Sequence, residues 1–287
     1  RLQGRAAFGA GVIQGTVFYS VTIYWISWIT LPGMAGAIVY MALFRGLFLW
    51  VLSRVVRQFG VLGFWSTPFI WVAFEYFSSI GDMGFPWALL GITQTEYLPL
   101  IQYAEFTGVF GVSFWIVVVN LAVLAILRQR LRLAASVVAL IVLFGIPTLY
   151  GLLLLSTPLD GRPVSIGAIQ PNIPPLAKQD LGFEYNFNIL QELTRPAAES
   201  GVDLVVWPET ATKAYLESEF HRRYRDRLQA YVDSLQVYLY TGAHRVETGP
   251  PVRSYNSSFL LSPGQSSLQR YDKIKLVPFG ERAPFPE

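Results

Sequence analysis

The chain begins with long apolar stretches and changes near residue 156 to short segments in which apolar and polar residues alternate. A helix that crosses about 30 Å of hydrocarbon needs roughly 20 apolar residues. Five stretches are long enough, near 7–30, 34–53, 61–80, 101–127 and 133–155. Tryptophans and prolines lie near their ends, as is typical of membrane helices and their connections. The pattern predicts a membrane bundle of about five spans.

After the bundle the pattern predicts strands and helices in alternation. Short apolar runs typical of buried strands occur at 163–170, 202–207 and 237–241, and we expect a turn at Gly242. Helical spacing of apolar residues occurs at 182–199 and 216–234. A hairpin is expected across Pro263-Gly264, between 258–262 and 268–271. This order implies a layered sheet covered by helices.

Charge separates the same two parts. Only 14% of the residues are charged, whereas soluble domains average about 25%. Residues 1–155 contain eight Lys/Arg and four Asp/Glu, and residues 156–287 contain fourteen and fifteen. We therefore expect a transmembrane domain at 1–155 and a water-soluble domain at 156–287. The excess positive charge belongs to the membrane part, so it indicates membrane orientation and not nucleic acid binding.

The basic residues of the first part alternate from connection to connection. Arg1 and Arg5 precede the first span, and Arg54 and Arg57 follow the second. The connection between the fourth and fifth spans contains Arg128, Arg130 and Arg132. By the positive-inside rule these connections are cytoplasmic. An odd number of spans then places 156–287 on the far side, which in a Gram-negative cell is the periplasm. We expect an inner-membrane protein.

Two charged residues interrupt the apolar stretches, Arg45 and Glu75. A charge inside a membrane is costly and is a functional hypothesis by default, but a structural pair or a side chain that reaches the headgroups is an equal alternative. The connection that contains Gly84-Phe85-Pro86-Trp87 is either a lid or lipid-docking surface, or a plain interfacial connection.

The candidate chemistry begins at Glu209, which follows the apolar run 202–207 directly after Trp207-Pro208. A carboxylate at the end of a buried strand is expected to be partly desolvated, which raises a carboxyl pKa toward the range of a general base. The alternative is a carboxylate at the N-terminus of a helix over 209–212.

Two further residues complete the candidate set. Lys273 is expected on one face of a strand together with Lys275, where an ammonium can stabilise an oxyanion; two exposed lysines are the alternative. Glu281 follows a Pro/Gly turn that can hold its side chain rigidly. The basic run 221–227 is typical of a solvated helix face. The two histidines, His221 and His244, have no cluster of ligands around them in sequence, and we expect no metal and no cofactor.

Three segments in the second part resemble the carbon–nitrogen hydrolase (nitrilase) superfamily. They are Trp207-Pro208-Glu209-Thr210, Tyr255-Asn256-Ser257 and Tyr271-Asp272-Lys273-Ile274-Lys275-Leu276-Val277-Pro278-Phe279-Gly280-Glu281. With the membrane spans, the Gly84-Phe85-Pro86-Trp87 connection and Gly108-x-x-Gly111-Val112-Ser113-Phe114, the whole chain is similar to the apolipoprotein N-acyltransferase family.

This resemblance implies a helical membrane bundle followed by an α+β nitrilase-like αββα sandwich, incomplete here. It implies transfer of an acyl chain from a phospholipid donor, through a cysteine thioester, to the N-terminal cysteine of a diacylated apolipoprotein. Residue by residue, Glu209 matches the general base, Lys273 the catalytic lysine and Glu281 a second essential carboxylate.

The sequence departs from the family in two places. The chain contains no cysteine, and the family's nucleophile follows the Pro-Phe-Gly-Glu turn, so we expect residues 1–287 to be an internal fragment that is inactive alone. In the segment Gln170-Pro171-Asn172-Ile173-Pro174 and its continuation, Gln179 stands where the family often has a tryptophan that contacts the acyl chain. The alternatives are a membrane-tethered amidase or nitrilase, or a cysteine-free relative that binds lipid or lipoprotein without turnover.

Overall fold

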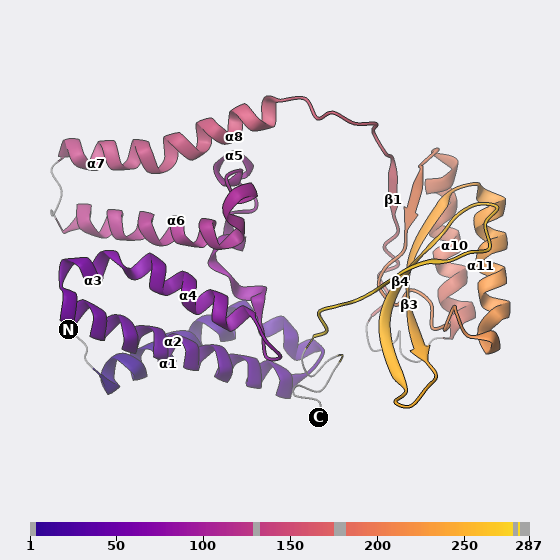
Figure 1. Cartoon of the computed structure of the whole chain (residues 1–287), viewed down its shortest axis with the longest axis horizontal. Helices are drawn as coiled ribbons and strands as arrows, with labels where there is room; N and C mark the ends of the chain where they lie inside the picture. Colours follow the sequence, from indigo (N-terminus) through magenta and orange to yellow (C-terminus); the bar gives the residue numbers. More distant parts are fainter. Residues whose placement is uncertain (1–3, 129–132, 175–181, 278–280, 282–287) are drawn as a thin grey trace. The chain divides into compact units, whose positions relative to one another are not determined.

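The computed structural model describes residues 4–128, 133–174, 182–277 and 281. The chain divides into two compact units, one formed by Arg1–Leu159 with Val277–Glu287 and the other by Asp160–Leu276 (Figure 1). The first unit is helical and the second contains a sheet. Each is described by itself.

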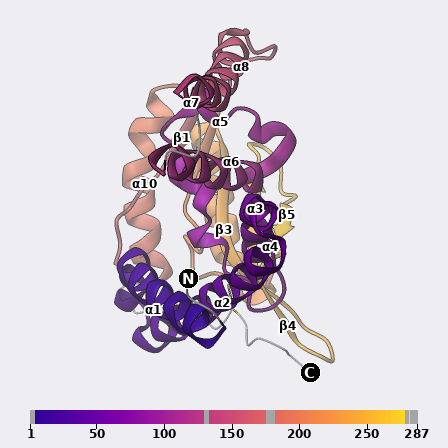
Figure 2. The ribbon, with the colours of Figure 1, turned by 90° about the vertical axis from the view of Figure 1, so that its left-hand side faces the viewer.

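The helical unit is built from helices that pack against one another, both between neighbours in sequence such as α1 and α2 and between more distant pairs such as α5 and α8. Its α-helices are α1 (Arg5–Thr22), α2 (Leu31–Phe59), α3 (Val61–Trp65), α4 (Thr67–Ser79), α5 (Leu98–Ile101), α6 (Ala104–Leu127), α7 (Leu133–Leu140) and α8 (Ile146–Ser156). Short 3-10 turns are η1 (Tyr24–Trp28), η2 (Pro86–Ala88) and η3 (Leu90–Gln94), and one π turn, η4 (Ile141–Gly145), joins α7 to α8. Viewed along the helices, α2 packs on α1, α4 on α2, and α6 on α4 (Figure 2).

Three helical stretches in the described residues are long and apolar enough to cross a membrane. They are Leu31–Phe59, Ala104–Leu127 and Ala134–Ser156. The other two expected spans are interrupted. The first is divided at Ile23 into α1 and η1, and the span expected at 61–80 is divided at Ser66. Pro68 lies in the first turn of α4, where its missing N–H costs nothing, so it favours a helix start at this point.

Helix α2 is longer than the apolar pattern predicts. It continues to Phe59 and therefore includes Arg54 and Arg57, which the sequence analysis assigned to a connection. Both arginines are exposed in the last two turns. Positive charge is favourable there because the C-terminal end of a helix is the negative end of its dipole.

Small residues allow α1 and α2 to approach closely. A Cβ atom at Gly11 would overlap the backbone of Arg45 and Gly46, and one at Gly15 would lie 2.9 Å from the Cα atom of Ala42. Helices in membranes associate largely through such close packing, because lipid leaves little hydrophobic driving force between them. The α1–α2 contact therefore depends on these glycines.

The sheet unit has five strands in the order β1-β2-β3-β4-β5. Its elements are β1 (Ile166–Ala168), α10 (Phe183–Glu199), β2 (Leu204–Val206), η5 (Glu219–His221), α11 (Arg222–Leu235), β3 (Tyr238–Glu247), β4 (Arg253–Leu261) and β5 (Gln269–Asp272). The first three strands are parallel, and β3, β4 and β5 are antiparallel. The predicted strand–helix alternation and the hairpin across Pro263-Gly264 are confirmed.

Helices α10 and α11 cover one face of this sheet (Figure 1). Buried side chains from both helices and from the strands form its core, including Phe187, Leu190, Val205, Leu228 and Phe259. The fold therefore begins as a layer of helices on a layer of strands, as expected for the first half of an αββα sandwich.

Two local predictions are wrong. The turn expected at Gly242 is absent, because β3 continues through Gly242 to Glu247 and pairs with β4 from Leu239 to Glu247. The strand expected to contain Lys273 and Lys275 ends at Asp272, so these lysines do not share a strand face.

Candidate functional site

Glu209 lies in the middle of the loop that follows β2, and this loop runs beside β3. The Trp207 N–H donates to the Tyr240 carbonyl at 2.8 Å, and the Ala211 N–H donates to the Gly242 carbonyl at 2.9 Å. Residues 208–210 lie between these two anchors. The side chain of Trp207 is buried under the sheet, so the loop has a fixed base, and Glu209 projects from it.

Gly242 explains why the loop fits against the sheet. A Cβ atom at this position would lie 2.6 Å from the Thr210 nitrogen and 2.8 Å from the Glu209 Cα atom. Such contacts are closer than van der Waals packing allows. A glycine in the middle of β3 therefore permits the close approach of the Glu209 backbone, and the sequence signal that suggested a turn reflects this packing.

Asn256 and Lys273 both contact the Glu209 carboxylate. The Lys273 Nζ atom lies 3.1 Å from Glu209 Oε1, and the Asn256 side-chain amide donates to the same oxygen. The Lys273 N–H donates to the Asn256 carbonyl at 2.8 Å, which extends the β4–β5 pairing beyond the end of β5. Asn256 belongs to the Tyr255-Asn256-Ser257 motif, but the sequence alone assigned it no role. Its pairing with Glu209 follows from strand register.

The exposure of this cluster differs from the expectation. The Glu209 side chain is 59% exposed and that of Lys273 is 33% exposed. The carboxylate is therefore exposed among the described residues, where the apolar residues before it were expected to desolvate it. The alternative of a helix N-terminus is also wrong, because 209–212 form a turn and a single bridge to β3 and not a helix.

A second polar cluster lies beside Lys273. The Asp272 carboxylate accepts from the Ser257 hydroxyl at 2.6 Å and from Arg245 at 3.2 Å. Burial acts to raise the pKa of Asp272, but the Ser257 hydroxyl and the Arg245 guanidinium outweigh it and hold the pKa below its ordinary value. Because Asp272 is bonded on both carboxylate oxygens, the backbone next to Lys273 is fixed.

Glu281 belongs to the other unit of the chain. Its carboxylate accepts from the Val277 N–H at 2.8 Å, and its own N–H donates to the Val277 carbonyl at 2.9 Å. The side chain is exposed and these contacts are local to its turn. The structure thus brings Glu209 and Lys273 together within one unit, and it assigns Glu281 to the unit that contains the helices.

The helical unit itself has two features to consider, the connection that contains Gly84-Phe85-Pro86-Trp87 and an apolar groove. In the connection, the Trp87 ring stacks on that of Trp25 at 5.2 Å between centroids, and the Phe85 N–H donates to the Ser78 carbonyl at 2.8 Å.

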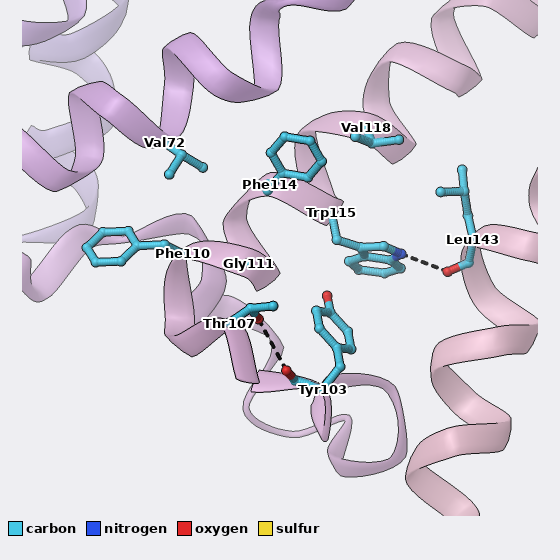
Figure 3. A pocket seen from close by; sticks show the side chains of 9 residues that line it. All are labelled: Val72, Tyr103, Thr107, Phe110, Gly111, Phe114, Trp115, Val118 and Leu143. Carbon is cyan, nitrogen blue, oxygen red and sulfur yellow. Dashed lines mark hydrogen bonds between the residues drawn. The ribbon is translucent and has the colours of Figure 1, made fainter. Parts of the chain in front are cut away.

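The groove, about 480 Å³ in volume, is lined almost entirely by apolar side chains of α4, α6 and η4. Trp115 closes one side through a bond of its indole N–H to the Leu143 carbonyl, and the hydroxyl of Tyr103 points into the groove (Figure 3).

Other predicted features are less informative. Gln179 lies outside the described residues. Asn172 has a positive φ of 52°, and its side chain accepts from the Gln170 amide at 2.9 Å. In the ranges that the structure describes, no group of three or more His, Asp or Glu residues lies close enough to hold a metal ion.

Comparison with known proteins covers both units. The profile of the apolipoprotein N-acyltransferase N-terminal domain matches residues 1–122, and that of the carbon-nitrogen hydrolases matches residues 165–287. An apolipoprotein N-acyltransferase of Geobacter metallireducens is 36% identical over 304 aligned residues, which cover 99% of this chain and 58% of the relative. The chain belongs to the apolipoprotein N-acyltransferase family. It is a membrane protein.

Other members of the apolipoprotein N-acyltransferase family show the same coverage. The protein of Chlorobaculum tepidum is 30% identical over 94% of this chain and 55% of its own length, and that of Aquifex aeolicus is 31% identical over 87% and 54%. The chain therefore spans about half the length of the curated relatives it matches. The alignment with the Geobacter metallireducens protein covers both the helical unit and the sheet unit.

Among solved structures, a carbon-nitrogen hydrolase from Helicobacter pylori matches with a TM-score of 0.32 and 17% identity, over 41% of each chain. The NitN amidase from Neterenkonia sp. matches with a TM-score of 0.33 and 17% identity, over 44% of this chain and 51% of that one.

Proposed function

We propose that the protein transfers an acyl chain from a phospholipid to the N-terminal amine of a diacylated apolipoprotein. The observation that carries this proposal is the Lys273–Glu209–Asn256 cluster in a chain that also contains membrane helices and matches relatives named for this activity. A membrane domain suits an enzyme whose acyl donor is a lipid, whereas an amidase with a small soluble substrate has no need of one.

The proposed reaction has two acyl transfers. A cysteine thiol attacks the phospholipid ester, the acyl chain forms a thioester, and the lysophospholipid leaves as an alcohol. The amine of the acceptor then attacks the thioester, an amide forms and the thiol is regenerated. Residues 1–287 contain no cysteine, so the proposal places this thiol outside them. No cofactor is required.

Each residue of the cluster has a proposed part in these steps. Glu209 accepts the proton of the thiol, returns a proton to the departing lysophospholipid oxygen and later accepts one from the amine. Lys273 stabilises the negative oxygen of the tetrahedral intermediates, for which a nearby cation is suited. Asn256 orients the Glu209 carboxylate through the bond to Oε1. Glu281 is proposed as a second essential carboxylate.

The proposal also fixes topology. Residues 1–155 are proposed to be a transmembrane domain of the inner membrane, and residues 156–287 part of a periplasmic domain. The exposed arginines at the end of α2 support a cytoplasmic location of that end.

The test is acyl transfer by the full-length protein in phospholipid vesicles, with a synthetic diacylated lipopeptide as acceptor and mass spectrometry as readout. An increase in lipopeptide mass by one acyl chain, with loss of one acyl chain from the phospholipid, is expected. Release of free fatty acid without lipopeptide acylation would indicate a hydrolase. Binding of lipopeptide without either product would indicate a non-catalytic relative.

A further inference from the structure

A small cavity inside the helical unit contains the two charged residues that interrupt the apolar stretches. It measures about 30 Å³ and lies among α1, α2, α4 and the residues before η3. The residues of its wall that matter here are Tyr19, Arg45, Trp71, Glu75, Ser78 and Leu89. Arg45 lies over the ring of Trp71, with 4.0 Å between the guanidinium carbon and the ring centroid.

Three polar atoms in this wall are buried and, in the described part of the chain, have no hydrogen-bond partner. They are Nε of Arg45, Nε1 of Trp71 and Oε2 of Glu75. Glu75 itself is only 9% exposed. A buried polar group without a hydrogen-bond partner is unfavourable, and more so when it is charged. Three such groups around one cavity therefore point to a bound ligand.

The size and charge of the cavity identify the class of ligand. A water molecule needs about 10–15 Å³ of such space, so the cavity has room for water. One carboxylate and one guanidinium offset each other, so the site favours a neutral ligand over a cation or an anion. The wall offers two donors and one acceptor, which water can satisfy together.

We propose that this cavity holds bound water, which bridges Arg45, Trp71 and Glu75 in the interior of the bundle. The N–H groups of Arg45 and Trp71 donate to the water oxygen, and the water donates to Oε2 of Glu75. This site does not depend on the proposed acyl transfer.

The water site has a structural consequence for the connection between α4 and α6. The second carboxylate oxygen of Glu75 accepts from the Leu90 N–H at 2.7 Å, and the Ser113 hydroxyl accepts from the Gly91 N–H at 2.8 Å. Glu75 therefore joins the water site on one side to the start of η3 on the other. This arrangement anchors the connection that contains Gly84-Phe85-Pro86-Trp87 to the interior of the bundle.

The first test is a structure of the full-length protein in lipid at a resolution that shows ordered water. Density for water is expected within hydrogen-bonding distance, about 2.7–3.2 Å, of Glu75 Oε2 and of at least one of the two N–H groups. An empty cavity between ordered side chains, or density for an ion, would overturn the proposal.

The second test is a double-mutant cycle in the same protein. Arg45→Met and Glu75→Leu each leave one buried charge unpaired, so each is expected to lower the melting temperature strongly. The double variant removes both charges and the need for water. Its melting temperature is expected to fall by less than the sum of the decreases in the two single variants. Additive losses would overturn the proposal. Glu75→Gln keeps the size of the side chain and one acceptor oxygen, and serves if Glu75→Leu does not fold.

Hydrogen exchange tests the anchoring. Glu75→Gln weakens the bond to Leu90, and exchange of the Leu90 and Gly91 amides is expected to become about tenfold faster or more, because bonds to charged groups contribute about 1.5–3 kcal/mol. Asn120→Leu, which removes an exposed amide from α6, is the control and should leave this exchange unchanged. Unchanged exchange in Glu75→Gln would show that Glu75 does not anchor the connection.

Discussion

The Lys273 ammonium lies 3.1 Å from Oε1 of Glu209, although 64 residues separate the two in sequence. Glu209 comes from the loop after β2 and Lys273 from the end of β5, which are not neighbours in the sheet. The loop passes over Gly242 in β3, and Asn256 in β4 contacts both residues. The pair therefore depends on the order and register of four strands.

Replacement of either member of the pair should prevent formation of the acyl-enzyme in the full-length protein. Glu209→Gln cannot accept the thiol proton, and a general base contributes about 10²- to 10⁴-fold to a rate. Lys273→Ala removes the cation from the developing oxyanion. Mass spectrometry of the protein after incubation with phospholipid measures the thioester. Lys275→Ala, which replaces an exposed lysine two residues away, is the matched control and should form the acyl-enzyme at the normal rate. Formation of the acyl-enzyme at the normal rate in Glu209→Gln or Lys273→Ala would exclude that residue from the chemistry.

Asn256→Ala should reduce the rate less than Glu209→Gln. The variant loses the side-chain bond to Glu209, but its backbone carbonyl still accepts from Lys273. A single hydrogen bond to a charged group contributes about 1.5–3 kcal/mol, which corresponds to roughly 10- to 150-fold. Single-turnover rates of thioester formation measure this effect. A loss as large as that of Glu209→Gln would mean that Asn256 does more than orient the carboxylate.

Gly242→Ala should displace the loop that holds Glu209. The added Cβ would meet the Thr210 nitrogen and the Glu209 backbone, and such overlap cannot be relieved by side-chain rotation. We expect lower acyl-transfer activity and a melting temperature lower by several degrees. Gly249→Ala introduces the same methyl group where no atom lies within 4 Å. Equal behaviour of the two variants would contradict this account of Gly242.

Acid should weaken the sheet unit through Asp272. Its pKa is lower in the folded protein than its ordinary value of 3.8. Between these two values the unfolded chain binds more protons, so this contribution to stability is complete at neutral pH and is lost as pH falls below about 4. The melting temperature of Asp272→Asn should therefore depend less on pH between 5 and 3 than that of the parent protein. Asp160→Asn, at an exposed position, should keep the parent's dependence, and an unchanged slope in Asp272→Asn would contradict the assignment.

Gly11→Ala should destabilise the helical unit, and Gly9→Ala in the same helix should not. A methyl group at Gly11 overlaps the backbone of α2, whereas one at Gly9 meets no atom within 4 Å. Alanine is otherwise the better helix former by about 1 kcal/mol, so the two variants should change stability in opposite directions. Thermal unfolding of the full-length protein in lipid measures both. A gain in stability from Gly11→Ala would show that α1 and α2 do not pack as closely as described.

The sequence by itself determined the features that depend on local patterns. Apolar length separates the membrane helices from the sheet unit, and periodicity locates α10, α11 and the strands around them, because each residue's preference acts within a few positions of the chain. Glu209 and Lys273 were found as candidates in the same way, from motifs that a short window contains.

Only the tertiary structure decided how distant residues meet. Strand order and register bring Lys273 and Asn256 to one oxygen of Glu209, leave that carboxylate exposed, and require a glycine in the middle of β3 where the sequence suggested a turn. Packing of α1, α2 and α4 likewise brings Arg45 and Glu75 to the wall of one cavity. Contacts of this kind depend on how whole elements pack, which no local pattern specifies.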